Sequence, residues 1–365
     1  MSQIDTFKYV GLFTFAVLLS VLLNTIFLKF SKNLGQRHVD EGMIRWSSVT
    51  KPSLGGISFY ILFLVTYSIY TIFFNRGTDL LNLQHIGILI SSGMGFLMGL
   101  SDDAYNTNPL LKFLVQIACG GVLILTGTYI SIFELQLFNY IFTILWVVAV
   151  MNSINMLDNM DAITTLASIF ILFSALTCAW VSPDFNQFYM TTLLGVAGGL
   201  IGFLFFNWNP SKMFMGDTGS QFLGIFLAAI GIIFFWNNKG ITEDEAITKQ
   251  FTITVLAFII PISDTLTVII NRLRRGQSPF VGGKDHTTHH LNYLGLTDRN
   301  VARVYIVIGF ISFILIYLIV NKFHIWSHML TALFLSFFVI VFGTLFAITQ
   351  LPKTKEKFKK SNGNK

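Results

Sequence analysis

Charged residues are scarce in this chain. Only 12% of its 365 residues are Asp, Glu, Lys or Arg, whereas 53% are hydrophobic. Soluble domains carry about one quarter charged residues, so this composition excludes an ordinary water-soluble protein. We therefore expect a polytopic membrane protein.

Cysteine is also rare. Cys119 and Cys178 are the two cysteines and lie in separate apolar stretches, which excludes a disulfide framework and a zinc ligand set. Internal repeats and long polar regions are lacking as well. We expect one transmembrane catalytic domain over residues 1–350, followed by a basic cytoplasmic tail over 351–365 that is disordered and has no catalytic role.

Long apolar runs, in contrast, are abundant. A spanning helix needs about 20 mostly apolar residues. The first run, 8–30, is too long for a signal peptide and lacks a small-residue cleavage site, so we interpret it as a span. The sequence predicts an all-α fold with about 11 transmembrane helices, at 8–30, 55–74, 85–101, 109–128, 137–155, 161–181, 188–206, 218–236, 250–270, 300–320 and 327–350.

Basic residues are distributed unevenly between the predicted loops. The net charge of +6 could indicate a nucleic acid partner, but basic residues in a membrane protein usually report orientation, so we expect no nucleic acid. Of the 24 Lys and Arg residues, 19 lie on one predicted side. The positive-inside rule makes that side cytoplasmic, with the N-terminus outside and the C-terminus inside. The other side holds Lys8, Arg76, Lys239, Lys249 and Lys322.

Carboxylates and amides gather on the same predicted side as the lysines. Asp102 and Asp103 end the third run, Asp217 opens the eighth, and residues 152–161 join the fifth run to the sixth; Asp264 lies inside the ninth. A carboxylate near the membrane interior is costly and is a candidate for function. Several converging carboxylates indicate a bound cation.

Two of these segments have a structural alternative. Neighbouring residues on a helix do not share a face, so Asp102 and Asp103 should have different roles, although the pair alone could be a capped, solvated turn. Asn152, Asn155 and Asp158 recur every three residues and fall near one helix face. Their oxygens suit Mg²⁺, a ribose or a base, but such residues can also join helices by hydrogen bonds.

A Gly-Asp-Thr-Gly turn precedes the eighth run. Gly216 and Gly219 allow close backbone approach, and a helix N-terminus attracts phosphate. Asp217 would repel an anion there unless a metal lay between them, so we predict that it binds Mg²⁺. Alternatively, Asp217 is a simple N-cap.

The loop near residues 271–299 combines arginines with histidines. Arg272 and Arg274 can bind phosphate, and His289 and His290 can donate hydrogen bonds or carry protons. Alternatively, these are ordinary basic residues of a cytoplasmic loop. Two adjacent histidines without cysteines make a poor zinc site.

These segments, in this order, resemble the polyprenyl-phosphate N-acetylhexosamine-1-phosphate transferase family. The matching segments are KPSLGGISFY (51–60), SDD (101–103), NSINMLDNMD (152–161), MFMGDTGS (213–220), PISDT (261–265), SPF (278–280) and DHTTHHL (285–291). The chain is more similar to bacterial undecaprenyl-phosphate GlcNAc-1-phosphate transferases than to phospho-MurNAc-pentapeptide transferases, whose loop has three histidines followed by Phe-Glu.

The resemblance implies roles for individual residues. The implied catalytic residues are Asp102 and Asp103, of which one acts on the acceptor phosphate, and His289. The implied substrate-binding residues are Lys51, Lys112 at the pyrophosphate, Asp158 at the nucleoside, Asp161 and Phe214 at the uracil, Arg272, Arg274 and His290. The implied metal ligands are Asp217 and Asn155.

The resemblance also implies an activity. The enzyme would transfer N-acetylhexosamine 1-phosphate, with GlcNAc as first choice, from a UDP-sugar to undecaprenyl phosphate, with Mg²⁺ or in its place Mn²⁺ as cofactor. It would start synthesis of a cell-envelope polysaccharide, in cell wall biogenesis or in the synthesis of lipopolysaccharide, O-antigen or teichoic acid. Its expected place is the bacterial cytoplasmic (inner) membrane, among membrane lipid, with the active site on the cytoplasmic face and a homodimer as an open alternative.

Two alternatives and two departures remain. The phospho-MurNAc-pentapeptide transferase is the alternative within the family. An ion-coupled transporter is the alternative outside it, although transporters place their acids near the midplane. The family's Asp-Gly-x-Asp-Gly lacks both glycines over 158–162, and its His-x-His-His reads Thr287-Thr288-His289-His290, with His286 displaced by one.

Overall fold

The computed structural model describes residues 3–31, 51–74, 82–182, 186–238, 247–279 and 282–362, and all regular elements in these ranges are helical. The helices of the first half are α1 (Gln3–Phe30), α2 (Gly55–Ile69) continued by the π-helical turn η1 (Tyr70–Phe74), α3 (Leu83–Tyr105), α4 (Pro109–Leu125), α5 (Gln136–Leu157) and α6 (Ile163–Val181). The remaining helices are α7 (Gln187–Asn207), α8 (Gly216–Gly231) continued by η2 (Ile232–Trp236), α9 (Ile247–Ala257), α10 (Ile259–Arg274), α11 (Thr287–Leu294), α12 (Asp298–Lys322), α13 (His328–Gln350) and α14 (Pro352–Asn362).

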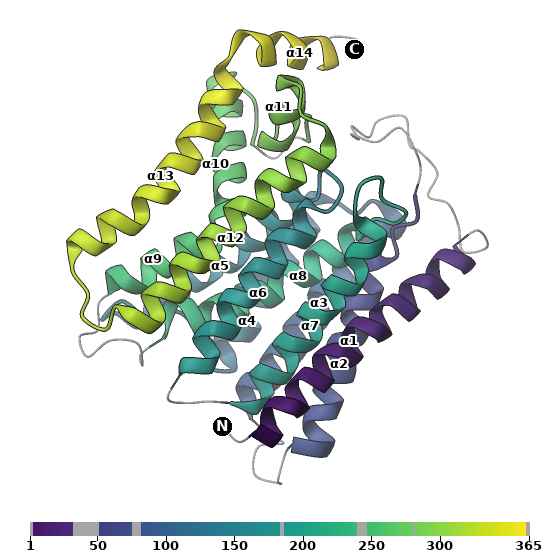
Figure 1. Cartoon of the computed structure of the whole chain (residues 1–365), viewed down its shortest axis with the longest axis vertical. Helices are drawn as coiled ribbons and strands as arrows, with labels where there is room; N and C mark the ends of the chain where they lie inside the picture. Colours follow the sequence, from purple (N-terminus) through teal and green to yellow (C-terminus); the bar gives the residue numbers. More distant parts are fainter. Residues whose placement is uncertain are drawn as a thin grey trace.

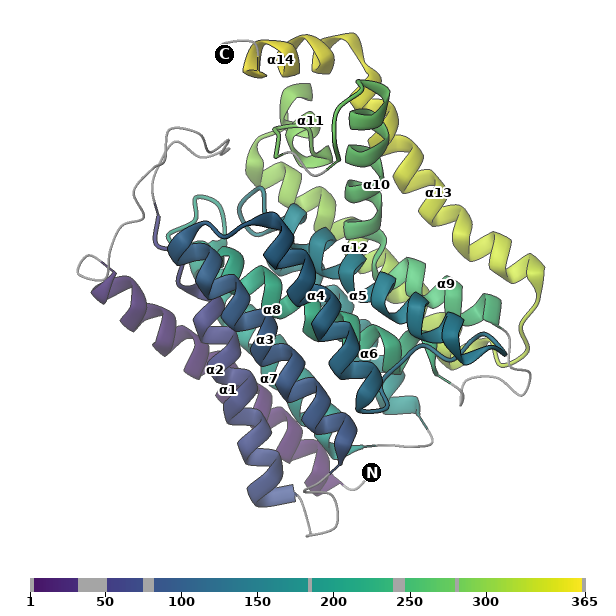
Figure 2. The ribbon, with the colours of Figure 1, turned by 180° about the vertical axis from the view of Figure 1, so that it is seen from behind.

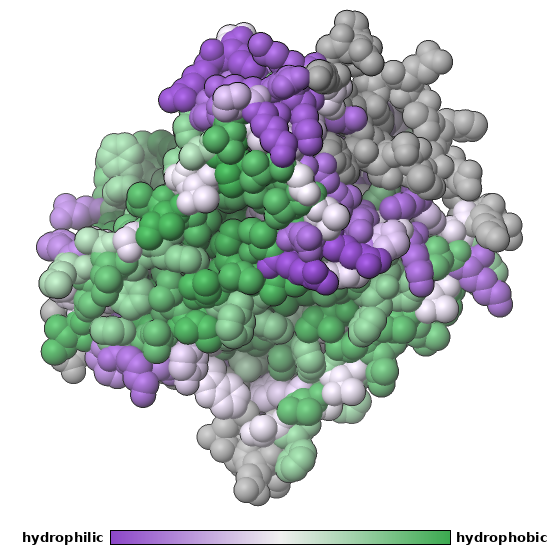
Figure 3. Space-filling view, turned by 45° about the horizontal axis from the view of Figure 1, so that its top comes forward, coloured by the Kyte–Doolittle hydropathy of each residue, from purple (hydrophilic) through white to green (hydrophobic). Residues whose placement is uncertain are grey.

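The all-α fold is confirmed for the described residues, and their long apolar helices are consistent with a polytopic membrane protein. Within the described ranges, nine helices are long and apolar enough to cross a membrane, or ten if the bent pair α9 and α10 is one broken span. The predicted run 109–128 forms α4, which is apolar but has 17 residues and falls below that length. A broad apolar belt separates hydrophilic ends on the face in Figure 3. The count of 11 and the orientation stay predictions.

Helix α8 lies at the centre of the bundle, packed against α3, α5 and α2 (Figure 1). Its span is 94% buried, whereas that of α13 is 17% buried. Small residues allow the close approach. A Cβ atom on Gly99 would lie 2.2 Å from the carbonyl oxygen of Asp217, and one on Gly56 would lie 2.2 Å from the Gly219 nitrogen. The start of α8 is therefore held tightly against α2 and α3.

The ninth predicted span is broken. Helices α9 and α10 meet at an angle of 79°. Pro261 cannot donate the helical hydrogen bond to the carbonyl four residues before it, which favours a break near the start of α10. Hydroxyls from neighbouring helices bond to carbonyl oxygens at the break: Ser312 donates to Leu256 (2.6 Å) and Ser153 to Pro261 (3.0 Å). The break thus turns α10 away from the direction of α9 (Figure 2).

The basic tail is not disordered over residues 352–362, so that prediction is wrong. These residues form α14, which packs on α11 (Figures 1 and 2). The Thr354 hydroxyl donates to the Ile348 carbonyl (2.8 Å), and the Phe358 ring lies 5.8 Å from the His290 ring. Lys353 donates to the last carbonyl of α11, that of Leu294 (3.2 Å). Hydrophobic and capping contacts order a segment whose composition alone suggests disorder.

Candidate active site

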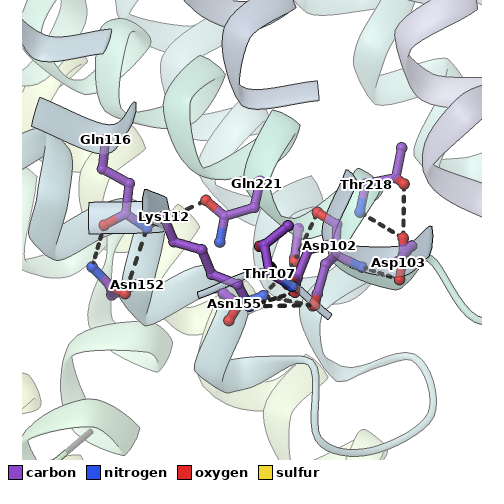
Figure 4. A network of polar contacts seen from close by, with 11 residues as sticks. Asp102, Asp103, Thr107, Lys112, Gln116, Asn152, Asn155, Thr218 and Gln221 are labelled. Carbon is purple, nitrogen blue, oxygen red and sulfur yellow. Dashed lines mark hydrogen bonds and ion pairs between the residues drawn. The ribbon is translucent and has the colours of Figure 1, made fainter. Parts of the chain in front are cut away.

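A group of polar side chains meets where α3, α4, α5 and α8 converge (Figure 4). We call it the carboxylate cluster, and it comprises Asp102, Asp103, Lys112, Asn155 and Asp217. Its members come from four segments that are far apart in the sequence. Each segment was singled out by the sequence, and the structure brings these five side chains together.

Asp102 lies near the C-terminal end of α3 and is 2% exposed. One carboxylate oxygen contacts the Lys112 ammonium group at the start of α4. The other accepts hydrogen bonds from the backbone and the hydroxyl of Thr107, both at 2.8 Å. Asp102 therefore holds the turn between α3 and α4 and fixes the position of the lysine.

Asp103 points in a different direction, as expected for adjacent residues on a helix. Its carboxylate accepts from the backbone nitrogens of Asp217 (3.2 Å) and Thr218 (2.9 Å) and from the Thr218 hydroxyl (2.7 Å). These are free N–H groups of the first turn of α8, where negative charge is stabilising. Asp103 thus caps α8 from another helix, so the alternative in which Asp217 is the N-cap is wrong.

Asp217 lies in the first turn of α8 and faces α4 and α5. Its carboxylate accepts from the Asn155 amide (2.9 Å) and lies 3.9 Å from the Lys112 ammonium nitrogen. The same Asn155 amide nitrogen donates to the Ser220 hydroxyl (2.8 Å). Since the amide nitrogen of Asn155 makes these bonds, its carbonyl oxygen is oriented away from them. Asp217 and Asn155 are therefore adjacent, with the amide nitrogen of Asn155 facing the carboxylate.

Amides continue the network into the bundle. Gln116 on α4 accepts from the Asn152 amide (2.7 Å) and donates to Gln221 on α8 (3.3 Å) (Figure 4). Gln116 is 1% exposed, and buried amides of this kind are stable only when hydrogen-bonded. This layer joins α4, α5 and α8 beneath the carboxylate cluster. Asn152 was predicted from its motif, whereas the two glutamines belong to no motif and were not predicted.

The residues assigned to the uracil by resemblance also lie together. The Lys51 ammonium nitrogen is 5.0 Å from the centre of the Phe214 ring and 3.8 Å from the Asp161 carboxylate. Asp161 accepts from Ser211 through its hydroxyl (2.7 Å) and backbone (3.0 Å), and from the Asn209 amide (3.0 Å). Asp161 therefore ties the turn after α5 to the segment that leads into α8. No local motif predicts this structural role.

Asp158 lies in the same turn, just after α5. Burial raises the pKa of the Asp158 carboxyl to about 7, and the negative charge of Asp103 adds to the rise. Asp161 contributes in the same direction. This part of the molecule therefore has an excess of negative charge, which a cation would offset.

A second polar group lies around α11, and we call it the histidine cluster. It comprises Asp264, Arg272, Asp285, His286, His289 and His290. Burial lowers the pKa of His289 to about 3 and that of His290 to about 4, so both rings are neutral at pH 7. The structure places these two predicted site residues in the interior of this cluster, at 2% and 3% exposure.

The predicted phosphate-binding arginines have partners within the protein. Arg272 is 4% exposed and forms a forked pair with Asp285, at 3.0 and 2.7 Å. Burial alone would raise the pKa of Asp285, but the hydrogen bonds and charge of Arg272 outweigh it and lower the pKa. Arg274 is exposed and lies 5.1 Å from the Phe346 ring. This geometry does not support a phosphate role for Arg272. The pairing of Arg272 with Asp285 was not predicted from the sequence.

A hydrogen bond joins the start of α11 to the turn after α5. The Thr288 hydroxyl at the start of α11 donates to the side-chain oxygen of Asn159 (2.5 Å), in the turn that carries Asp158 and Asp161. His289 is the next residue along the chain. The predicted nucleoside and histidine segments are therefore joined directly, through two residues to which no role had been assigned.

The donor groups of the carboxylate cluster are compatible with Mg²⁺. Among the described residues, no group of three or more His, Cys, Asp or Glu side chains could hold a metal ion alone. Mg²⁺, however, is usually held by one or two carboxylates together with substrate phosphates and water, rather than by a protein cage. The Asp217 carboxylate meets that requirement, and Asn155 lies beside it, with its amide nitrogen 2.9 Å from a carboxylate oxygen.

Comparison with known proteins agrees with the motifs. The sequence profile of glycosyl transferase family 4 matches residues 85–235. The chain is 29% identical over 322 residues to a probable undecaprenyl-phosphate N-acetylglucosaminyl 1-phosphate transferase of Bacillus subtilis (strain 168), covering 84% of this chain and 82% of the relative.

Two further relatives are named as transferases of the same general kind. A decaprenyl-phosphate N-acetylglucosaminephosphotransferase of Mycolicibacterium smegmatis is 29% identical over 251 residues, covering 62% of this chain and 61% of the relative. A phospho-N-acetylmuramoyl-pentapeptide-transferase of Bacillus mycoides is 29% identical over 328 residues, covering 82% and 94%. The chain thus resembles glycosyl transferase family 4 over residues 85–235, and polyprenyl-phosphate N-acetylhexosamine-1-phosphate transferases over most of its length.

Proposed function

We propose that this protein transfers an N-acetylhexosamine 1-phosphate, with GlcNAc 1-phosphate as first candidate, from a UDP-sugar to undecaprenyl phosphate. A phosphate oxygen of the lipid attacks the sugar-linked phosphorus of the UDP-sugar. The bond from that phosphorus to the bridging oxygen breaks, and UMP leaves with the electron pair. The products are a lipid diphosphate sugar and UMP.

The observation that carries this proposal is the carboxylate cluster. Phosphoryl transfer requires positioning and neutralisation of charge more than a strong nucleophile. Lys112 supplies a positive charge, and its side chain is 25% exposed while its partner Asp102 is 2% exposed. Lys112 is therefore the member of this pair that can reach the phosphates, and Asp102 keeps it in place.

Asp217 and Asn155 would hold Mg²⁺, and Mn²⁺ could replace it. When bound, the ion neutralises charge on the pyrophosphate and on the departing UMP. Lys51, Phe214 and Asp161 would bind the uracil, and Asp158 the ribose. Asp103 is engaged by the first turn of α8, and Asp102 by Lys112 and Thr107, so in this proposal the two carboxylates position α8 and Lys112.

The acceptor would reach the cluster from the bilayer, with its polyprenyl chain between helices. We place the cluster on the cytoplasmic face of the bacterial membrane, where UDP-sugars are available. The product would start a cell-envelope polysaccharide.

A donor comparison tests this proposal. Purified protein with Mg²⁺ and undecaprenyl phosphate is given UDP-GlcNAc, UDP-GalNAc or UDP-MurNAc-pentapeptide. Release of UMP is measured, and the lipid product is identified by mass. We expect release with UDP-GlcNAc and a lipid product heavier by one GlcNAc phosphate.

Two other outcomes would replace the proposal. Exclusive use of UDP-MurNAc-pentapeptide would make the protein a phospho-MurNAc-pentapeptide transferase. The sequence does not favour this outcome, because the loop reads His289-His290-Leu291-Asn292 and lacks the triple histidine followed by Phe-Glu. No release of UMP from any donor would contradict the transferase and favour the ion-coupled transporter.

A further inference from the structure

Asp264 is a fully buried carboxylate on α10 with no place in the reaction proposed above. Its exposure is 0%. Both of its oxygens are bound by residues at the start of α11. One accepts from the backbone nitrogen (2.8 Å) and the hydroxyl (2.5 Å) of Thr287, and the other lies 2.7 Å from His286 Nδ1. Three contacts therefore connect one carboxylate to two adjacent residues.

The position of these contacts has a physical consequence. A buried carboxylate is strongly destabilising unless it is paired and hydrogen-bonded. The N–H groups of a helix N-terminus also favour a negative charge. Asp264 thus stabilises the first turn of α11 in its observed position. Moving that turn would leave the Asp264 carboxylate buried without its hydrogen-bond partners.

Two more hydrogen bonds fix the same turn. The Thr287 hydroxyl also lies 2.6 Å from the Tyr305 hydroxyl on α12, and Tyr305 is fully buried. The next residue, Thr288, bonds to Asn159 in the predicted nucleoside turn. The start of α11 is therefore joined to α10, to α12 and to that turn.

These contacts involve positions at which the sequence departs from the family pattern. Thr287 stands at the first histidine of His-x-His-His, and Asn159 at the first glycine of Asp-Gly-x-Asp-Gly. The displaced His286 bonds to the same carboxylate as Thr287. The departures are therefore not scattered losses, because they meet in one hydrogen-bonded network.

We propose that Asp264 is a positioning residue for the transfer reaction, which acts by holding the first turn of α11 and thereby the placement of His289 beside the nucleoside turn. Asp264 does not touch substrate in this account. The expected effect of Asp264 on the rate of transfer rests on the proposed function. The fixing of α11 stands independently and is tested separately.

The kinetic test uses four variants and compares kcat per monodisperse molecule. Asp264→Asn keeps the shape but loses the charge, and Thr287→Val keeps the shape but loses the hydroxyl. We expect kcat to fall about 10- to 100-fold in each, the scale of a small misplacement. Thr287→Ser should restore kcat to near wild type. Ser263→Ala is the matched control, since Ser263 is buried next to Asp264 and its hydroxyl makes no hydrogen bond in the described chain.

The structural test measures hydrogen exchange of residues 287–294. We expect faster exchange there in Asp264→Asn and Thr287→Val, and wild-type exchange in Thr287→Ser and Ser263→Ala. Wild-type kcat and wild-type exchange in Asp264→Asn would overturn the proposal. If Asp264→Asn does not fold, equal kcat in Thr287→Val and Thr287→Ser would overturn it. A wild type that releases no UMP would instead refute the proposed function, and the exchange data would still decide the role of Asp264.

Discussion

The carboxylate cluster and the histidine cluster contain similar residues but match their charges differently. In the histidine cluster, Asp285 is paired with Arg272 and Arg275, and Asp264 is satisfied by α11. In the carboxylate cluster, Asp102 and Asp217 both pair with the same cationic group, Lys112. A group with matched charges can serve as scaffold by itself. A group with spare negative charge is suited to receive a cation and a substrate.

Removing a carboxylate from the carboxylate cluster should have the largest effect on activity and little effect on stability. We expect Asp217→Asn to lower kcat at least about 100-fold, the scale of losing a preorganised charge at a phosphoryl-transfer site. Without Mg²⁺ its melting temperature should not fall, since the change relieves repulsion between carboxylates. Glu134→Gln, an exposed carboxyl in the α4–α5 connection, is the control. Full activity of Asp217→Asn would remove the distinction between the clusters.

Removing the Asp285 carboxylate from the histidine cluster should instead have a large effect on stability and a small effect on activity. Asp285→Asn leaves the Arg272 guanidinium buried with only part of its bonding, and this should lower the free energy of unfolding by about 3 to 5 kcal/mol. Chemical denaturation in detergent measures it. The double variant Arg272→Met with Asp285→Leu should recover most of the loss. If Asp285→Asn is as stable as wild type, the pair is not a scaffold.

The histidine cluster should also make stability depend on pH. His289 and His290 have lowered pKa values when folded, while an unfolded histidine has its ordinary value near 6.5. Below pH 6.5 the unfolded chain binds more protons, so stability falls as the pH drops toward 4. Each ring should contribute a loss of about 2 kcal/mol between pH 7 and pH 5.

Melting temperatures measured from pH 7 to pH 5 test this dependence. The variant His290→Gln removes one of the two titrating rings, so its melting temperature should fall less steeply than that of wild type. An identical slope in the two proteins would show that His290 is accessible to protons in the folded state, contrary to its burial.

The smallest effect is expected at the tail helix. Phe358 of α14 contacts His290, and its ring lies 5.0 Å from the Arg275 guanidinium. Phe358→Ala should reduce stability by about 1 kcal/mol through loss of these contacts. Lys357→Ala, on the exposed side, should change nothing measurable. A loss as large as that of Asp285→Asn would mean that α14 is part of the scaffold.

Motifs predicted the members of the carboxylate cluster well, because polar residues at the ends of apolar helices have few structural reasons to be there. The different directions of Asp102 and Asp103 followed from helix geometry alone. The sequence did not predict that Asp103 caps α8, since a cap from another helix leaves no local pattern. It also assigned Arg272 to phosphate, because the partner Asp285 lies across a turn whose shape cannot be inferred from spacing.

The fold shows the same limits. Hydropathy located the apolar helices, but it interpreted 250–270 as one span, although Pro261 was a local signal for a break. The helicity of residues 352–362 depends on packing against α11 and could not be seen in a lysine-rich composition. Contacts between distant elements, rather than local preference, decide these features.

The central claim is that the carboxylate cluster receives the cation on which transfer depends. Its most direct test is the melting temperature of purified protein, first freed of metal by chelation and then supplied with UDP-GlcNAc, as Mg²⁺ is added. A ligand that binds only the folded state must stabilise it. We predict a saturable rise for wild type and for Glu134→Gln, and none for Asp217→Asn. An equal rise in Asp217→Asn would contradict the account.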